Sequence, residues 1–360
     1  MDIAIVGLPQ SGKTTAFQAL TAGHGSASAE ARGELVGVVK IPDERLYKLA
    51  ELVKAKKTTP IEVFLHDLPP LFQRGAAPSG SAGETLARAD ALLHVVHAFE
   101  RPDVPHPLES VNPARDIKDF DSELMLFDLG IAERRLEKLE AAARSGKVAE
   151  KEAAEREKAL LQKVHSLLEK DTPLRDQITD AADIRALANF GLLSLKPMLL
   201  LLNIGEDAVG EQSRVAAEYE SSHGGPRTRA TAICAKLEAE LAELTPEEAA
   251  EFRRDLGAPA GGTQAVLEQA RELLGLLTFF TAGEKDTRAW TLPEGGTALQ
   301  AAGRIHTDIE RGFIRAEVIR WDTLLEFGSH NEARKKGQLR QEGKTYVVQD
   351  GDVINVLFNV

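Results

Sequence analysis

Residues 7–14 read GLPQSGKT, and this octapeptide constrains the possible folds more than any other stretch of the chain. It matches GxxxxGK[ST], the P-loop pattern, in which a glycine-rich turn joins a buried strand to a helix and surrounds phosphate oxygens with backbone N–H groups. The apolar run 3–6 precedes it, and Phe17 and Leu20 follow at helical spacing. The pattern therefore predicts an α/β domain that binds a nucleoside triphosphate.

The motif also assigns roles to individual side chains. We expect the phosphates to be contacted by Gln10, Ser11, Gly12, Lys13, Thr14 and Thr15. Lys13 would reach the β- and γ-phosphates, and the Thr14 hydroxyl would coordinate Mg²⁺. A second metal-side acid is needed at the end of a neighbouring strand. Asp67 closes the run 61–66 and is the candidate, acting through water; a turn or helix-cap role is the alternative.

Composition places the chain among globular proteins. Its 360 residues suggest two or three domains, and 43% hydrophobic and 28% charged residues exclude a disordered chain. A net charge of -12 argues against indiscriminate attraction to nucleic acid or anionic lipid, so an RNA partner would meet a restricted face. The single cysteine, Cys234, excludes an internal disulfide framework and fits a reducing cytosol.

The sequence predicts neither a signal peptide nor a membrane-spanning segment. A first strand that begins at residue 2 leaves no room for a signal peptide, and the apolar run 197–204 is too short to span a bilayer. We therefore expect a cytoplasmic protein without membrane association.

Periodicity divides the chain into three zones. Strands are predicted at 3–6, 61–65, 91–96, 196–202 and 230–234, which is typical of an α/β sheet. Between them, residues 121–170 lack proline and have helical spacing, so they predict two antiparallel helices joined near 144–147. From about residue 277, strands at 289–292, 346–348 and 353–358 and a helix at 298–306 indicate a small ubiquitin-like sheet that clasps one helix.

These zones predict a domain organisation. We expect a nucleotide-binding domain over 1–119 and 176–277, an inserted helical hairpin over 120–175, and a C-terminal β-grasp domain over 278–360.

Base selectivity is encoded after the strand that ends at Leu202. GTPases carry Asn-Lys-x-Asp there, and its aspartate accepts two hydrogen bonds from guanine; this chain has Asn203, Ile204, Gly205 and Glu206. Glutamate, one methylene longer, misplaces both acceptors, and Ile204 replaces the lysine that stacks on the base. Guanine selectivity should be lost and adenine admitted. Asn203 is alternatively a simple turn residue.

A second loop is expected at the same base. Cys234, Ala235 and Lys236 stand where a further base-contacting loop belongs, with the Ala235 N–H facing the purine.

The residues after Asp67 weaken the case for fast hydrolysis. Ras-like proteins read Asp-x-x-Gly here, but this chain has Pro70, which has no N–H for the γ-phosphate. The position of the water-orienting glutamine is Leu71, so no catalytic residue is identified. We interpret 21–32 and 68–83 as mobile loops. His94 and His97, near a strand end, are interpreted as packing residues.

Together these motifs resemble the YchF subfamily of Obg-like ATPases, which are P-loop NTPases with a C-terminal TGS domain. The resemblance covers nearly the whole chain and is carried by residues 7–14, 42–46, 203–206, 280–283, 288–291, 305–318 and 347–352. It implies a Ras-like nucleotide domain with a hairpin insertion, and ATP bound in preference to GTP with slow hydrolysis. It also implies association with ribosomes or RNA, and a hydrophobic residue in place of the catalytic glutamine, as at Leu71.

Three positions depart from the pattern of the subfamily. Ala31 stands near the threonine that completes the Mg²⁺ shell, Pro70 replaces the second-switch glycine, and Gln10 replaces an asparagine that is an ion ligand in potassium-stimulated relatives. Mg²⁺ is therefore the expected cofactor and K⁺ a second candidate, with turnover impaired by Ala31 and Pro70.

The leading hypothesis is a weak ATPase, monomeric, with a regulatory role linked to the ribosome or RNA and no affinity for DNA. The alternative is a hydrolysis-deficient scaffold that acts through its hairpin and TGS domain. A true GTPase is the third option, in which GTP competes at least as well as ATP.

Overall fold

The computed structural model describes residues 1–23, 25–26, 34–69, 71, 80–144, 151–259 and 261–359. The chain forms two compact units, one of residues 1–39 and 64–273 and the other of 40–63 and 274–360. We expected 40–63 in the nucleotide-binding domain. The difference arises because this segment supplies a helix and a short strand to the second unit.

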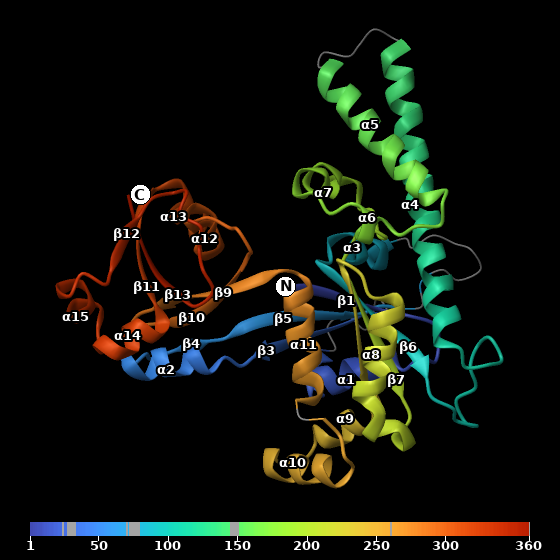
Figure 1. The fold of residues 1–360 in the computed structure, drawn as a ribbon, viewed down its shortest axis with the longest axis horizontal. Coiled ribbons are helices and arrows are strands. Elements are labelled where there is room, and N and C mark those ends of the chain that lie inside the picture. The colour runs from blue at the N-terminus through green and yellow to red at the C-terminus, as the bar shows by residue number, and fades with distance from the viewer. Residues whose placement is uncertain are drawn as a thin grey trace. The chain divides into compact units, whose positions relative to one another are not determined.

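The first unit is built on a seven-stranded sheet in the order β2-β3-β5-β1-β6-β7-β8 (Figure 1). Its strands are β1 (Asp2–Val6), β2 (Gly25–Ser26), β3 (Leu35–Ile41), β5 (Ile61–Asp67), β6 (Ala91–Ala98), β7 (Met198–Ile204) and β8 (Thr228–Ile233). β1 pairs in parallel with β5 and β6, and β6, β7 and β8 continue the parallel arrangement. All seven residues of β7 are buried, as a central strand of a parallel sheet requires.

The first unit also contains helices. They are α1 (Lys13–Thr21), α3 (Gly80–Arg88), α4 (Pro113–Arg144), α5 (Lys151–Leu168), α6 (Leu174–Gln177), α7 (Ala181–Leu187), α8 (Gln212–His223), α9 (Ala235–Leu241), α10 (Pro246–Asp255) and α11 (Gly262–Leu273). No helix in the described part of the chain is long and apolar enough to cross a membrane.

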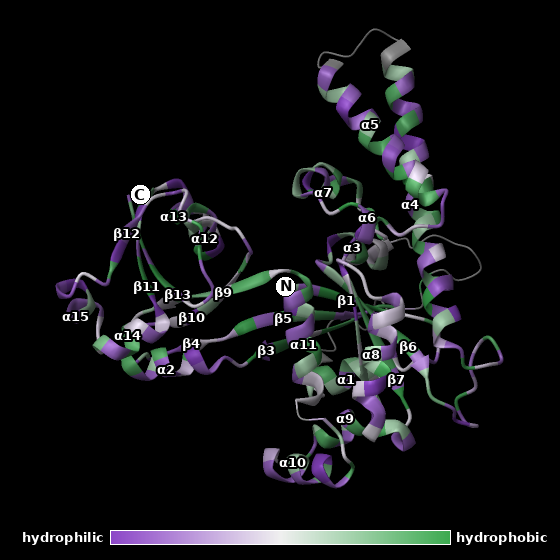
Figure 2. Cartoon of the chain, viewed as in Figure 1, coloured by the Kyte–Doolittle hydropathy of each residue, from purple (hydrophilic) through white to green (hydrophobic). Residues whose placement is uncertain are grey.

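The predicted hairpin is present as α4 and α5, which lie side by side and carry hydrophobic and hydrophilic residues along their lengths (Figures 1 and 2). The ion pair Lys158–Glu140 and the contact of His165 with Glu133 join the two helices, and their spacing is that of antiparallel neighbours. α4 begins earlier than expected, at Pro113, because the Asn112 side chain accepts a hydrogen bond from the Arg115 N–H and proline suits a first helical turn. Of the predicted turn, 145–147 lies outside the described residues.

Two buried polar side chains anchor α4 to the rest of the unit. Asp128 accepts hydrogen bonds from the N–H groups of Leu193 and Ser194, both at 2.7 Å, and from the Ser194 hydroxyl. Arg175, only 2% exposed, donates to Asp121 and to the Thr228 hydroxyl at the start of β8. The hairpin is therefore tied to the rest of the unit by buried polar contacts as well as by apolar packing.

The second unit contains a six-stranded sheet in the order β12-β11-β13-β9-β10-β4. Its strands are β4 (Thr58–Thr59), β9 (Leu276–Ala282), β10 (Thr287–Pro293), β11 (Phe313–Arg320), β12 (Arg340–Glu342) and β13 (Asp352–Phe358). The helices are α2 (Glu44–Leu52), α12 (Ala298–Ile305), α13 (Thr307–Arg311), α14 (Trp321–Phe327) and α15 (His330–Lys335). The apolar face of α12 packs with residues of the sheet around Phe279, as in a β-grasp domain.

The strand expected at 346–348 is absent. Val347 forms only an isolated bridge with Thr297, since the Tyr346 carbonyl and the Val348 N–H bond to residues 298 and 296 at the start of α12. This segment therefore closes the N-terminal end of α12 instead of extending the sheet.

His94 on β6 is a buried packing residue, as predicted. Its ring stacks on Phe120 with centroids 4.2 Å apart, and neither ring nitrogen has a hydrogen-bond partner. Burial, followed by the positive charges of Arg175 and Lys13, lowers the pKa of His94 to about 3.

We predict that His94→Phe removes part of the pH dependence of stability. As the pH falls below the ordinary histidine value of 6.5, the unfolded chain binds a proton that the folded chain does not, so the free energy of unfolding decreases. Between pH 7 and 5 the variant should lose about 2 kcal/mol less than the wild type, as measured by urea denaturation. Equal losses in both proteins would contradict the prediction.

Candidate functional site

The P-loop lies between β1 and α1, as the sequence predicts. Gly7 has φ +144° and Gly12, the N-cap of α1, has φ +91°. A Cβ at Gly7 would collide with the Val95 carbonyl oxygen, and a Cβ at Gly12 with the side-chain nitrogen of Asn203. Both the backbone conformation and the close packing therefore require glycine at these two positions.

Lys13 is held inside this loop. Its side chain is 8% exposed, and its ammonium donates to the carbonyl oxygens of Gly7 at 3.1 Å and Leu8 at 3.0 Å. Burial lowers the pKa of Lys13, and the Asp67 carboxylate opposes that shift. The ammonium therefore lies beside the loop backbone, where it can contact the oxygens of a bound phosphate.

Thr14 and Asp67 meet, as the sequence predicts. The Thr14 hydroxyl donates to Asp67 Oδ2 at 2.7 Å, while Asp67 Oδ1 is buried without a partner. Burial raises the pKa of Asp67, and the Thr14 hydrogen bond and the charge of Lys13 oppose the rise. The Ser11 hydroxyl is a second buried oxygen without a partner.

These oxygens fit Mg²⁺. A hydroxyl and a carboxylate with an unused oxygen are hard donors, and Mg²⁺ in such sites takes one or two protein ligands and completes its shell with water and phosphate. Thr14 and Asp67, the latter through water, would hold the ion, which would neutralise phosphate charge when bound.

Asn203 joins the phosphate end of the site to the base end. Its side chain, in a residue 5% exposed, donates through Nδ2 to the Ser11 carbonyl at 2.9 Å and accepts through Oδ1 from the Ala235 N–H at 3.0 Å. It is therefore a structural bridge and not a free turn residue. The expectation that the Ala235 N–H faces the purine is wrong, because that N–H is buried and bonded to Asn203.

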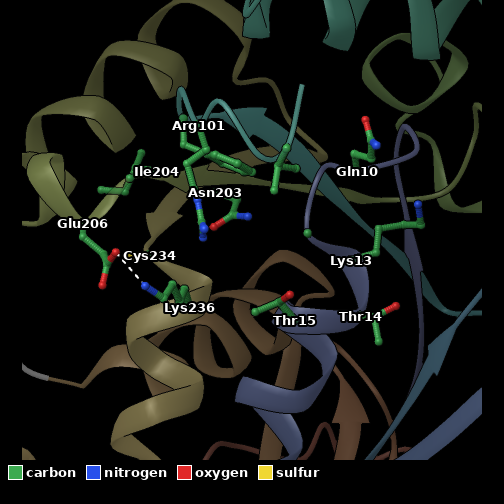
Figure 3. Close-up of a pocket in the computed structure, with 14 residues that line it drawn as sticks. Gln10, Lys13, Thr14, Thr15, Arg101, Asn203, Ile204, Glu206, Cys234 and Lys236 are labelled. Atoms are coloured by element: carbon green, nitrogen blue, oxygen red, sulfur yellow. Dashed lines mark hydrogen bonds and ion pairs between the residues drawn. The ribbon is translucent and has the colours of Figure 1, made fainter. Parts of the chain in front are cut away.

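A cavity of about 370 Å³ runs from the P-loop to the base end (Figure 3). Its lining includes the predicted Gln10, Gly12, Lys13, Thr14, Thr15, Asn203, Ile204, Glu206 and Cys234, together with Gly205. The other three predicted residues, Ser11, Asp67 and Ala235, do not line the cavity. The structure thus brings the phosphate and base motifs, about 190 residues apart in the chain, to one cavity.

Lys236, which the sequence analysis placed in the base-contacting loop without a role of its own, also lines the cavity. Three lining residues were missed by the sequence analysis: Phe99, Arg101 and Val104. They follow β6, whose carboxyl end lies beside that of β1. In open α/β sheets ligands bind at the carboxyl ends of the strands, so the loop after β6 could have been named once the strand order was known.

At the base end, Lys236 Nζ lies 2.9 Å from Glu206 Oε2 (Figure 3). Both side chains are about half exposed, at 47% and 53%. The carboxylate that a GTPase would use to read guanine is therefore already paired with a cation.

The residues expected near the γ-phosphate are only partly described. Leu71 is 9% exposed and packs in the hydrophobic core with residues such as Val6 and Leu86. Ala31 and Pro70 lie outside the described residues, as do parts of the loops expected at 21–32 and 68–83.

Comparison with known proteins places the chain in a family. A protein of Haemophilus ducreyi named ribosome-binding ATPase YchF is 39% identical over 371 residues, and the match covers 99% of this chain and 98% of that protein. The chain belongs to the YchF family. A Bacillus subtilis protein of the same name is 38% identical over 368 residues, with all of both chains covered.

Further comparisons agree with the YchF assignment. The family described as "YchF-GTPase_C: Protein of unknown function (DUF933)" matches residues 276–359. The structure of the Schizosaccharomyces pombe YchF GTPase superposes with a TM-score of 0.81 at 28% identity, covering 99% of this chain and 97% of that one. A GTP binding protein from Pyrococcus horikoshii, at 20% identity and a TM-score of 0.61, shares the fold. The YchF resemblance and the predicted P-loop fold are confirmed.

Asn203→Ala is predicted to destabilise this YchF-family chain. The substitution leaves the buried Ser11 carbonyl and Ala235 N–H without partners, and each such loss costs about 1–3 kcal/mol. We expect the free energy of unfolding to fall by about 2–5 kcal/mol in urea denaturation. Asn189→Ala, at an exposed asparagine of the same unit, is the control and should change it by less than about 0.5 kcal/mol. An unchanged unfolding midpoint in Asn203→Ala would show that the bridge is dispensable.

Proposed function

We propose that this chain binds ATP in preference to GTP, hydrolyses it slowly, and serves a regulatory role linked to the ribosome or RNA. One observation supports this most: a single cavity joins the P-loop, with its Thr14–Asp67 pair, to a base end where Lys236 neutralises Glu206. The name ribosome-binding ATPase, carried by relatives that match the whole chain, supports both the reaction and the partner.

The proposed preference for adenine follows from the charges at the base end. Guanine presents two N–H donors that need a free, correctly placed carboxylate, whereas adenine presents no such pair. Glu206 is engaged by Lys236, so guanine would have to displace a cation. The apolar side chains of Phe99 and Ile204 offer surfaces that suit any purine.

Slow hydrolysis follows from what surrounds the γ-phosphate position. Leu71 stands where Ras-like proteins carry the water-orienting glutamine, and its side chain packs in the core. Pro70 has no N–H to donate, and Ala31 has no hydroxyl for the Mg²⁺ shell. We propose that these three residues together limit turnover.

The wider proposals follow from the family and from the site. We propose that the chain acts as a monomer in the cytoplasm, where ribosomes are found, and engages neither DNA nor membranes. Mg²⁺ is the ion we assign to Thr14 and Asp67. K⁺ is proposed as a second ion near Gln10, and a comparison of nucleotide binding in KCl and NaCl tests it.

Titration and single-turnover hydrolysis test this function. ATP should bind more tightly than GTP in isothermal titration calorimetry with Mg²⁺, with KCl and NaCl compared. Phosphate release should be slow, faster with ribosomes, and absent in Lys13→Ala. No release above that variant under either condition would leave the scaffold alternative, and equal or tighter GTP binding would indicate a GTPase. Failure to bind any triphosphate would refute the proposal.

Lys236→Ala should relax the discrimination between the two purines. Removing the ammonium frees the Glu206 carboxylate, so GTP affinity should rise relative to ATP by on the order of fivefold, about 1 kcal/mol for a pair this exposed. Lys236→Arg retains the ion pair and should keep the wild-type ratio. A ratio of ATP to GTP affinity that is unchanged in Lys236→Ala would contradict this account of selectivity.

Pro70→Gly should accelerate hydrolysis. It restores a backbone N–H at the position where Ras-like proteins donate to the γ-phosphate. A single such donor is worth on the order of 10²–10³ in rate in other enzymes, so we expect roughly a tenfold gain in single-turnover rate. ATP affinity serves as the control and should stay within about twofold, a difference below 0.5 kcal/mol. A rate equal to that of the wild type would rule out the missing donor as a cause of slow turnover.

A further inference from the structure

A network of buried polar side chains holds the loop between β6 and α4. The residues of this network belong to neither the phosphate motif nor the base motif. Residues 99–112 form no helix or strand and contain three prolines, yet His106 within them is 8% exposed. Phe99, Arg101 and Val104 of this loop line the nucleotide cavity. Whatever holds the loop therefore also shapes the base end of the cavity.

His106 and Asp116 form the centre of this network. His106 Nε2 lies 2.7 Å from Asp116 Oδ2, and both side chains are 1% exposed. The Leu108 N–H donates to His106 Nδ1 at 3.1 Å, so Nδ1 is an acceptor and the ring proton lies on Nε2, facing the carboxylate. Both ring nitrogens thus have hydrogen-bond partners, and one side chain joins the loop to the first turn of α4.

Arg115 closes the other side of the network. Its Nε and Nη2 donate to Asp116 Oδ1 at 3.0 and 2.8 Å, and Nη2 also donates to the Ser110 carbonyl at 2.7 Å. The Asp116 carboxylate therefore accepts on both oxygens. The far end of the loop is fixed to the same turn of α4.

His97 contacts both His106 and Phe99. Its ring stacks on the Phe99 ring with centroids 3.9 Å apart at 22°, and meets the His106 ring at 4.8 Å. His97 Nε2 donates to the Phe99 carbonyl at 2.9 Å, while Nδ1 is buried without a partner. The His97 ring thus lies between the Phe99 ring, on which it stacks, and the His106 ring, which is tilted by 49° to it, and Phe99 lines the cavity.

We infer that His97, supported by the His106–Asp116 pair, is a positioning residue for purine recognition that holds the Phe99 ring in place at the base end of the cavity. The inference rests on the proposed nucleotide-binding function and adds residues that do not touch the cavity. A preset ring lowers the cost of ordering an aromatic contact when the base arrives. Burial lowers the pKa of His97, which favours the uncharged ring at neutral pH.

A double-mutant cycle between His97 and Phe99 tests this inference. ATP affinity of the full chain is measured by calorimetry with Mg²⁺ for the wild type, His97→Ala, Phe99→Ala and the double variant. His97→Ala should weaken ATP binding by roughly three- to tenfold, the range expected for one aromatic pair. In the Phe99→Ala background the same substitution should have no further effect, because His97 acts through Phe99.

Two additional measurements distinguish a positioning role of His97 from a purely structural one. Inorganic tripolyphosphate, used as a competitor, has no base, so its affinity should be the same in His97→Ala and the wild type. His97→Phe keeps the ring and should restore most of the ATP affinity. If His97→Ala loses its cooperative unfolding transition, His106→Asn replaces it in the cycle.

The outcomes are distinct. Equal weakening of ATP and tripolyphosphate, additive effects in the cycle, or unchanged ATP affinity in His97→Ala would each overturn the inference while the wild type still binds ATP. A wild type that binds no ATP would overturn the proposed function, and the inference with it.

Discussion

The site depends on one buried amide. Asn203 bonds to the Ser11 carbonyl in the P-loop and to the Ala235 N–H at the start of α9, and so it joins the end of β7 to the turns that follow β1 and β8. Gly12 must lack a side chain for this amide to approach. An amide suits the position because it donates on one side and accepts on the other, and both partners are buried backbone groups. The phosphate and base ends of the cavity are thereby held in one geometry.

Around this bridge, charge is arranged differently at the two ends of the cavity. At the phosphate end, Lys13 is buried beside backbone carbonyls and Asp67 retains an unpaired oxygen, so both groups are poised for charged ligands. At the base end, Glu206 and Lys236 neutralise each other at a half-exposed rim. An incoming triphosphate therefore gains from new contacts with its phosphates, whereas guanine would have to break an existing ion pair. This contrast is the physical basis of the proposed preference for ATP.

The residues whose placement was predicted correctly are those in which neighbouring residues determine each other. The P-loop requires a strand, two special backbone conformations and a helix within about a dozen residues, and Asp67 ends a strand whose pattern is evident. The prediction for the Ala235 N–H was wrong because its partner, Asn203, is 32 residues away and the direction of that hydrogen bond depends on packing. Phe99 and Arg101 were missed because their place follows from β6 lying next to β1 in the sheet.

The amino-acid sequence by itself determined the family, the phosphate-binding turn and the alternation of strands and helices, because these depend on motifs and on periodicities of a few residues. The tertiary structure alone decided that residues 40–63 join the second unit, where β4 pairs with β10 across more than 200 residues. It alone also decided that Glu206 meets Lys236, and that the His97 ring contacts both His106 and Phe99 beside the base end. Such contacts depend on strand order and on side-chain packing, which no local pattern in the chain specifies.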